Sequence, residues 1–129
     1  MMTSVGYAKW TKVAETKDGS SIYIELDRIR KNGDKIFFWG LKDIATLKID
    51  KNTGQIIKAL KIYYEAECGR FRLRMLTAFF YSSSMGKGDP IQIIREEEMS
   101  SKEKSWTYPP PDTRGETMLK AVCNHNSMQ

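Results

Sequence analysis

Two consecutive stretches in the middle of the chain alternate between two kinds of side chain, and this feature constrains the fold more than any other. In residues 60–67 the even-numbered positions hold Leu, Ile, Tyr and Ala, and the odd-numbered positions hold Lys, Tyr, Glu and Glu. In residues 70–75, Arg alternates with Phe, Leu and Met. A period of two is typical of a half-buried strand. One strand over residues 57–81 would far exceed the usual length, so we predict two antiparallel strands joined by a tight turn at Cys68-Gly69.

This turn defines a pairing register for the two strands. On one face it pairs Glu67 with Arg70, Glu65 with Arg72 and Tyr63 with Arg74. On the other face it brings together Ala66 and Phe71, Tyr64 and Leu73, and Ile62 and Met75. Opposite charges across a hairpin stabilise it by roughly 0.2–1 kcal/mol per pair. That one register suits both faces is the main support for the hairpin.

Other strands are predicted on both sides of the hairpin. They cover residues 8–15, 21–26, 35–41 and 91–95, with turn signals such as Asn32-Gly33 between them. We expect a helical turn or bend at Asp27 to Lys31 and a loop over residues 42–53. Bulky side chains on both faces of residues 36–39 place that strand near the middle of a sheet.

A short helix is predicted close to the C-terminus, and it carries one of the two cysteines. Residues 113–116 match a capping box, and Met118, Leu119, Val122 and Cys123 lie on one side at helical spacing, toward the sheet. From the residues alone, two alternatives stay open for Cys68 and Cys123. Either both are reduced, buried thiols, or they form a disulfide that closes a loop of 55 residues, worth about 4 kcal/mol.

Residues suited to catalysis or metal binding are not grouped in the sequence. Two cysteines and the single His125 do not make a closed zinc site, which typically has four protein ligands. Glu96, Glu97 and Glu98 read as a solvated run, and no nucleophile lies in a known activating motif. We therefore predict no catalytic residue, no metal site and no cofactor.

The most suggestive binding feature is the arginine stripe with its interleaved aromatic residues. The candidate binding surface consists of Arg70, Arg72, Arg74, Tyr63, Trp106 and Tyr108. Stacked aromatic and basic side chains occur on single-stranded nucleic-acid platforms. However, glutamates face the stripe across the predicted hairpin, and the net charge of +5 is spread along the chain. We therefore favour a structural role for the stripe and expect nucleic acid not to be the partner.

Several of these features occur in the order found in a known family. They are Trp10, Tyr23 to Gly33, Phe38 to Asp43, Glu67-Cys68 with the Arg70 to Arg74 alternation, Met85 to Gly88, Trp106 to Pro111, and Leu119 to Cys123. In this respect the chain resembles the surface-adhesin protein E-like domains, small envelope proteins of gram-negative bacteria. Glu67 stands where members often carry Asp, and none of the namesake's binding motifs maps onto these residues.

The resemblance implies an α+β fold. It consists of a single antiparallel sheet of about six strands, with a C-terminal helix packed on one face and tied by a Cys68–Cys123 disulfide. We assign the domain to residues 8–124 and expect flexible termini at 1–7 and 125–129. The family also implies export, with a signal upstream of this sequence, to the periplasm or outer-membrane surface. No stretch is apolar enough for a transmembrane segment.

The function expected from these observations is that of a non-enzymatic envelope protein, an adhesin-like or accessory domain with an unknown protein or envelope partner. The family's namesake binds host matrix proteins and haem and can dimerise, but these ligands are not carried over, because none of its binding motifs maps onto this sequence. One alternative is a small-molecule carrier of haem type, which would use the aromatic residues Phe37, Trp39, Tyr64, Phe71 and Phe79. Another is a cytosolic nucleic-acid-binding module built on the arginine stripe. A homodimer also stays open, because residues 78–80 are apolar on both faces of their strand.

Overall fold

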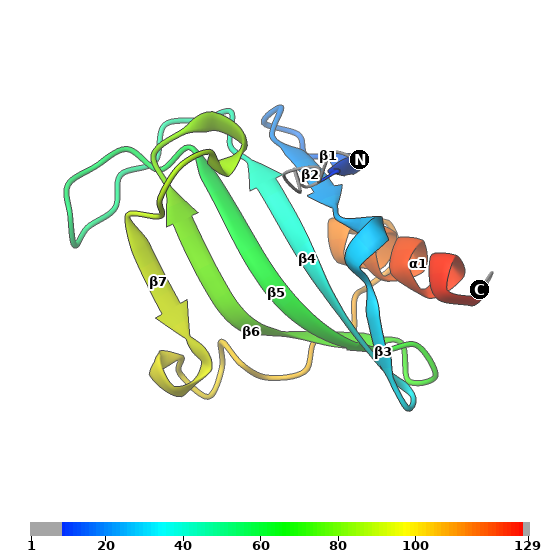
Figure 1. The fold of residues 1–129 in the computed structure, drawn as a ribbon. Coiled ribbons are helices and arrows are strands. Elements are labelled where there is room, and N and C mark those ends of the chain that lie inside the picture. The colour runs from blue at the N-terminus through cyan, green and yellow to red at the C-terminus, as the bar shows by residue number, and fades with distance from the viewer. Residues whose placement is uncertain (1–8, 128–129) are drawn as a thin grey trace, which may run out of the picture.

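An antiparallel sheet of seven strands forms the body of the protein, and one helix lies against it (Figure 1). The computed structural model describes residues 9–127, and for residues 126 and 127 only the backbone. The strands are β1 (Thr11–Glu15), β2 (Ser21–Ile24), β3 (Arg30–Asn32), β4 (Lys35–Asp43), β5 (Ala59–Glu67), β6 (Arg72–Tyr81) and β7 (Gln92–Arg95). The helix is α1 (Arg114–Ser127), and the 3-10 turns are η1 (Leu26–Arg28), η2 (Ser84–Gly86) and η3 (Glu96–Glu98).

The strand order is β1-β2-β4-β5-β6-β7, and β3 pairs with the start of β4. The fold class expected from the resemblance is therefore confirmed. The segment after β2 differs from expectation, because only its first part, η1, is a helical turn. Its second part is β3, which a turn at Gly33, with φ of 68°, joins to β4. All three residues of β3 are exposed, so no alternation of apolar side chains marks this strand in the sequence.

The face of the sheet that α1 covers, which we call the helix face, holds the main core. Ile24, Ile36 and Phe38 are fully or almost fully buried there against Leu119 and Val122 of the helix. The strands contribute alternate residues, since successive side chains of a strand point to opposite faces. The predicted helix stripe at Met118, Leu119 and Val122 is thus confirmed as the contact surface.

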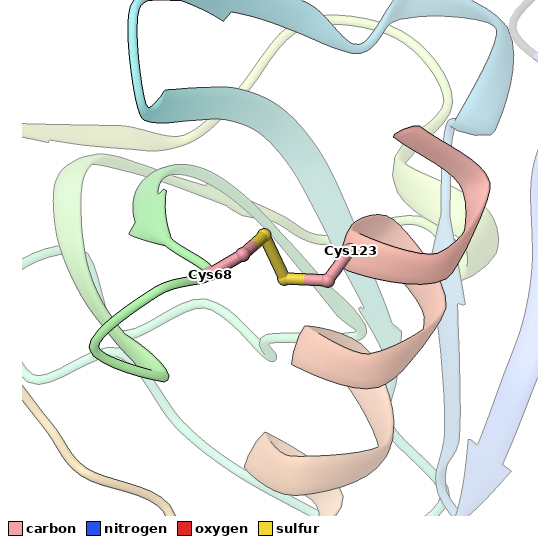
Figure 2. The surroundings of a disulfide bond; sticks show 2 residues. All are labelled: Cys68 and Cys123. Carbon is pink, nitrogen blue, oxygen red and sulfur yellow. A yellow bond between two sulfur atoms is a disulfide. The ribbon is translucent and has the colours of Figure 1, made fainter. Parts of the chain in front are cut away.

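The helix is fixed at both ends. At its start, Thr113 Oγ1 accepts a hydrogen bond from Glu116 N, and Glu116 Oε1 accepts one from Asp112 N. Near its end a disulfide joins Cys123 to Cys68 at the end of β5, with the Cα atoms 5.8 Å apart (Figure 2). This settles the choice between thiols and disulfide. The helix runs to Ser127, past the predicted domain limit at 124, whereas residues 1–8 and 128–129 lie outside the described residues.

The β5–β6 hairpin exists, but the register predicted for it is wrong by two residues. Glu67 pairs with Arg72 and Glu65 with Arg74, because the connection spans Cys68 to Phe71 rather than a two-residue turn. Phe71 adopts a left-handed conformation with φ of 50°, which is uncommon for a bulky residue. Its ring packs against the main core. A shift of two residues preserves the faces, so the predicted division between charged and apolar sides survives.

A β-bulge at Leu76 interrupts β6. Tyr64 pairs with Met75 but Tyr63 pairs with Thr77, so Leu76 is an extra residue in β6. The side-chain alternation changes phase at this point. As a result Ala78 and Phe80 lie on the helix face, opposite Ile62 and Leu60, while Phe79 and Tyr81 point to the other side of the sheet.

The turn between β1 and β2 depends on a carboxylate. Asp18 Oδ1 accepts hydrogen bonds from Thr16 Oγ1 and from Ser20 N. These hydrogen bonds lower the pKa of Asp18 from 3.8 to about 2. The bond from the Thr16 hydroxyl has the largest effect, and the bond from the Ser20 amide has the second largest. A group whose folded-state pKa is depressed contributes stability above its unfolded pKa and loses that contribution as the pH falls through the folded value.

We therefore expect Asp18→Asn to lower stability in a pH-dependent way. The difference in urea midpoint between wild type and variant should be full above about pH 4 and should disappear as the pH approaches about 2. Asparagine keeps an acceptor but does not ionise, so it isolates the effect of charge. A difference in midpoint that stays the same from pH 6 to pH 2 would contradict this expectation.

Candidate binding surface

The face of the sheet opposite α1, which we call the second face, is lined by aromatic side chains at its centre. Phe37 and Trp39 come from β4, Tyr63 from β5 and Phe79 from β6, and all four are half-buried. Tyr63 stacks on Phe37 at 6.2 Å between ring centroids and packs on Trp39 at 4.8 Å. Trp39 in turn meets Phe79 edge-on at 5.6 Å. These contacts form a continuous aromatic row across three strands.

Three hollows lie along this row. The first, of about 320 Å³, lies between Trp10 and Trp39. The second, of about 440 Å³, shares Trp39 and Phe79 with the first and is bounded by residues 95–97. The third, of about 410 Å³, shares Tyr63 with the second and reaches residues 30–32. Neighbouring hollows share walls and therefore adjoin one another along the row, and we call the three together the aromatic groove.

The hollow beside Trp10 also holds charged groups. The ammonium of Lys61 lies 4.7 Å from the ring centroid of Tyr81 and 5.9 Å from that of Trp10. Burial lowers the pKa of Lys61, and the negative charge of Glu25 partly offsets this. Glu25 is buried, and its Oε2 lies 3.3 Å from Arg28 Nε. Within the described part of the chain, this oxygen makes no hydrogen bond. The hollow thus combines aromatic walls with charges of both signs.

Beyond the aromatic row, towards the β5–β6 connection, the second face is ionic. Glu65 is only 3% exposed. Its carboxylate contacts Lys35 Nζ at 3.0 Å and Arg74 Nη2 at 2.7 Å. Arg74 Nη1 also contacts Glu96 at 3.1 Å. These pairs connect β4, β5, β6 and η3, so the charges of this cluster are largely satisfied within the protein.

Arg72 holds the segment that leads towards the helix. Its side chain pairs with Glu67, and the hydrogen bond from Arg72 is the main cause that lowers the pKa of Glu67. The guanidinium lies 4.0 Å from the ring centroid of Trp106 and donates to the Tyr108 hydroxyl at 3.1 Å. Thr107, between these rings, exchanges two backbone hydrogen bonds with Leu73. Residues 106–108 thereby extend the sheet along the edge of β6.

Comparison with known proteins places this fold in a family. The family model described as surface-adhesin protein E matches residues 10–124. The chain belongs to the surface-adhesin protein E family. The match includes every aromatic residue of the groove, from Trp10 to Tyr81, and both cysteines of the disulfide.

Solved structures of Haemophilus influenzae protein E share the fold. A structure of Haemophilus influenzae protein E has a TM-score of 0.67 and 14% identity, with 99% of this chain and 92% of that chain covered. A structure of protein E from non-typeable Haemophilus influenzae also has a TM-score of 0.67 and 14% identity, covering 98% and 82%. No curated protein sequence matches the chain.

The predicted surface residues occupy three places in this family member. Arg72, Trp106 and Tyr108 form one cluster, and Arg74 joins it at 5.2 Å from the Trp106 ring centroid. Tyr63 lies on the same face but in the aromatic row. Arg70 is exposed in the β5–β6 connection, near enough to Glu67 to lower its pKa slightly. The structure therefore separates the arginine cluster from the groove.

Sequence reasoning missed several residues of the groove. Trp10, Glu25, Lys61 and Tyr81 were not among the candidates, although all four line the hollow beside Trp10. The aromatic set considered for a haem carrier is also divided between the two faces. Phe37, Trp39 and Phe79 line the groove, whereas Tyr64 stacks on Phe38 in the main core and Phe71 packs against the same core.

Neither a metal centre nor a membrane-spanning helix is seen in the described residues. Between residues 9 and 127, no three side chains of His, Cys, Asp or Glu are grouped so that they could hold a metal ion. The helices in that range are too short or too polar to cross a bilayer.

Proposed function

We propose that the protein is an exported, adhesin-like binding protein of the cell envelope and that it binds a protein partner in the aromatic groove. The observation that carries this proposal is the continuous row of half-buried aromatic side chains on the face that α1 leaves uncovered. Membership of a surface-adhesin family supports a binding role rather than catalysis. The chain also shares its fold with Haemophilus influenzae protein E.

The groove has the chemistry of a protein-binding site. Tyrosine and tryptophan are enriched among residues that contribute most to protein interfaces, and they act from well-packed pockets. Trp39 and Tyr63 are held in place by ring contacts on neighbouring strands, so little side-chain freedom is lost on binding. Charged side chains border all three hollows, Arg28 the first, residues 95–97 the second and Arg30 with Lys31 the third, and they supply a polar rim.

The disulfide supports the exported location. Disulfides persist in oxidising compartments such as the bacterial periplasm and cell surface, and they are rare in the cytosol. Cell fractionation followed by a free-thiol count on the denatured protein tests this part of the proposal. Protein from the envelope fraction should show no free thiol before reduction and two after it, since Cys68 and Cys123 are the two cysteines of the sequence.

Trp39→Ala is the decisive variant for the groove. Host matrix proteins immobilised on a biosensor surface are suitable probes, and wild type should bind at least one of them. Truncating an aromatic residue at the centre of an interface typically costs 2 kcal/mol or more, so we expect the variant to bind at least about 30-fold more weakly. Tyr63→Ala should weaken binding in the same direction.

Leu47→Ser is the matched control, because it removes an exposed apolar side chain outside the groove. It should bind like wild type, and urea unfolding should show that all three variants are folded. If Trp39→Ala binds as tightly as wild type, the groove is excluded as the binding site. Binding by none of the matrix proteins would remove host adhesion and leave the envelope itself as the source of partners.

The two alternatives stay predictions with their own tests. A haem titration that leaves the Soret band unchanged would remove the carrier function. A nucleic-acid module would show binding that weakens steeply with salt. Its arginines Arg72 and Arg74 are already engaged by Glu67 and Glu65, which is why we favour the groove over that function.

A further inference from the structure

A narrow arm projects from the end of the sheet opposite the β5–β6 connection. It comprises residues 44–58, between β4 and β5, and reaches beyond the strands (Figure 1). Its two sides run antiparallel, with hydrogen bonds from Ile44 N to Lys58 O and from Ile57 N to Lys48 O. A third bond, from Asp50 N to Gln55 O, closes the tip. The arm is therefore an ordered element rather than an open loop.

Exposed aliphatic side chains gather on this arm. Among the described residues, four large apolar side chains are exposed. Three of them are on the arm, namely Leu47 at 72%, Ile49 at 58% and Ile56 at 43%, and the fourth is Tyr108 at 60%. Ile49 and Ile56 form an antiparallel bridge, so their side chains lie next to each other on one side. The inward residues Ile44 and Ile57 are buried and anchor the arm to the sheet.

The exposed charges of the arm are positive. Lys48, Lys51 and Lys58 are all exposed. Asp50, the one acidic residue of the arm, is buried and accepts hydrogen bonds from Thr53 N and Thr53 Oγ1 at 3.1 and 2.7 Å. The carboxylate of Asp50 therefore points into the turn and stabilises the tip of the arm.

The base of the arm carries charges of both signs, Lys42 and Arg114 beside Asp18 and Asp43. Burial is the main cause that lowers the pKa of Lys42. The positive charge of Arg114 and, to a smaller extent, that of Lys48 lower it further, whereas Asp18 opposes the shift. Asp43, also at the base, accepts a hydrogen bond from Met85 N at 2.7 Å.

We infer that this arm docks onto the surface of a phospholipid bilayer that carries anionic headgroups. Leu47, Ile49 and Ile56 would enter the boundary between headgroups and acyl chains, and the lysines would contact the anionic headgroups. Peripheral membrane binding needs this combination of a small apolar insertion and positive charge. A stable protein interface requires about 800 Å² from each partner, more than three aliphatic side chains on a narrow arm offer.

Vesicle co-sedimentation of the oxidised, full chain tests this inference. The probes are vesicles of phosphatidylcholine alone and vesicles that also contain phosphatidylglycerol. Wild type should bind the anionic vesicles and should lose that binding as salt is raised. Each lysine near an anionic leaflet contributes about fivefold to partitioning. Lys48→Glu with Lys51→Glu should therefore weaken binding by about 25-fold or more, and Leu47→Ser with Ile49→Ser by at least about tenfold.

Tyr108→Ser is the matched control, because Tyr108 is as exposed as Ile49 but lies outside the arm. It should bind anionic vesicles like wild type. Three results would overturn the inference: no wild-type binding to anionic vesicles at low salt, equal binding to both kinds of vesicle, or arm variants that bind like wild type. A change of oligomeric state in the Leu47→Ser, Ile49→Ser variant would show that a second copy covers the arm instead.

Discussion

Replacing both Cys68 and Cys123 with alanine is expected to lower the free energy of unfolding by about 4 kcal/mol. The disulfide closes a loop of 55 residues that contains β6, β7 and the segment leading to α1. In the unfolded chain this bond restricts the loop, and its loss restores conformational entropy to the unfolded state. The effect is a large part of the 5–15 kcal/mol that stabilises a typical domain.

Urea unfolding of oxidised wild type and of the double variant measures this effect. Wild type unfolded in the presence of a reductant is the control, and it should match the variant within about 1 kcal/mol, because both lack the bond. If the free energy of unfolding of the double variant is within about 1 kcal/mol of that of oxidised wild type, the prediction is contradicted. In that case the core contacts of α1 alone would hold the helix on the sheet.

The second large effect is expected for Phe38→Ala. Phe38 is fully buried on the helix face, stacked on Tyr64 at 5.1 Å and packed in the same cluster as Leu119. Truncating such a side chain removes buried apolar surface and leaves a cavity, which costs about 3–5 kcal/mol. We expect the urea midpoint to fall accordingly, with the disulfide intact.

Phe37→Ala is the matched control for this prediction. The two residues are neighbours on β4 but point to opposite faces, and Phe37 is only half-buried. Its truncation should cost about 1–2 kcal/mol, because part of the ring is already in contact with water. Equal destabilisation by the two variants would mean that the second face contributes as much to the core as the helix face. The second face would then be less available as a binding surface.

The sequence supported the main features of the fold because they depend on local patterns. The alternation of residues 60–75 predicted the hairpin, and the spacing of Met118, Leu119 and Val122 predicted the inner side of the helix. The hairpin register was wrong because Phe71 adopts a conformation with positive φ. Its packing against the core and the hydrogen bond from Phe71 N to Cys68 O favour that conformation, and packing is not visible in a local pattern.

The binding surface was harder to predict than the fold. Phe79 and Tyr81 lie on the second face only because the bulge at Leu76 changes the alternation. The apolar run of residues 78–81 was the one available signal, and it did not show which residue faced which side. Glu25 and Lys61 come together with Trp10 through the sheet order, which no spacing in the sequence encodes.

The bulge at Leu76 also limits which insertions and deletions strand β6 can tolerate. Before it, odd-numbered residues of β6 such as Leu73 and Met75 face the helix, and after it the even-numbered Ala78 and Phe80 do so. Deleting one residue there would exchange the interior and exterior side chains of the rest of the strand. The second face has a buried cluster of its own, formed by Leu41, Ala59 and Tyr81. Substitutions of the half-buried residues Phe37 and Tyr63 on that face, by contrast, leave the helix-face core unchanged. New binding specificities can therefore arise by substitution, whereas strand length around Leu76 is constrained.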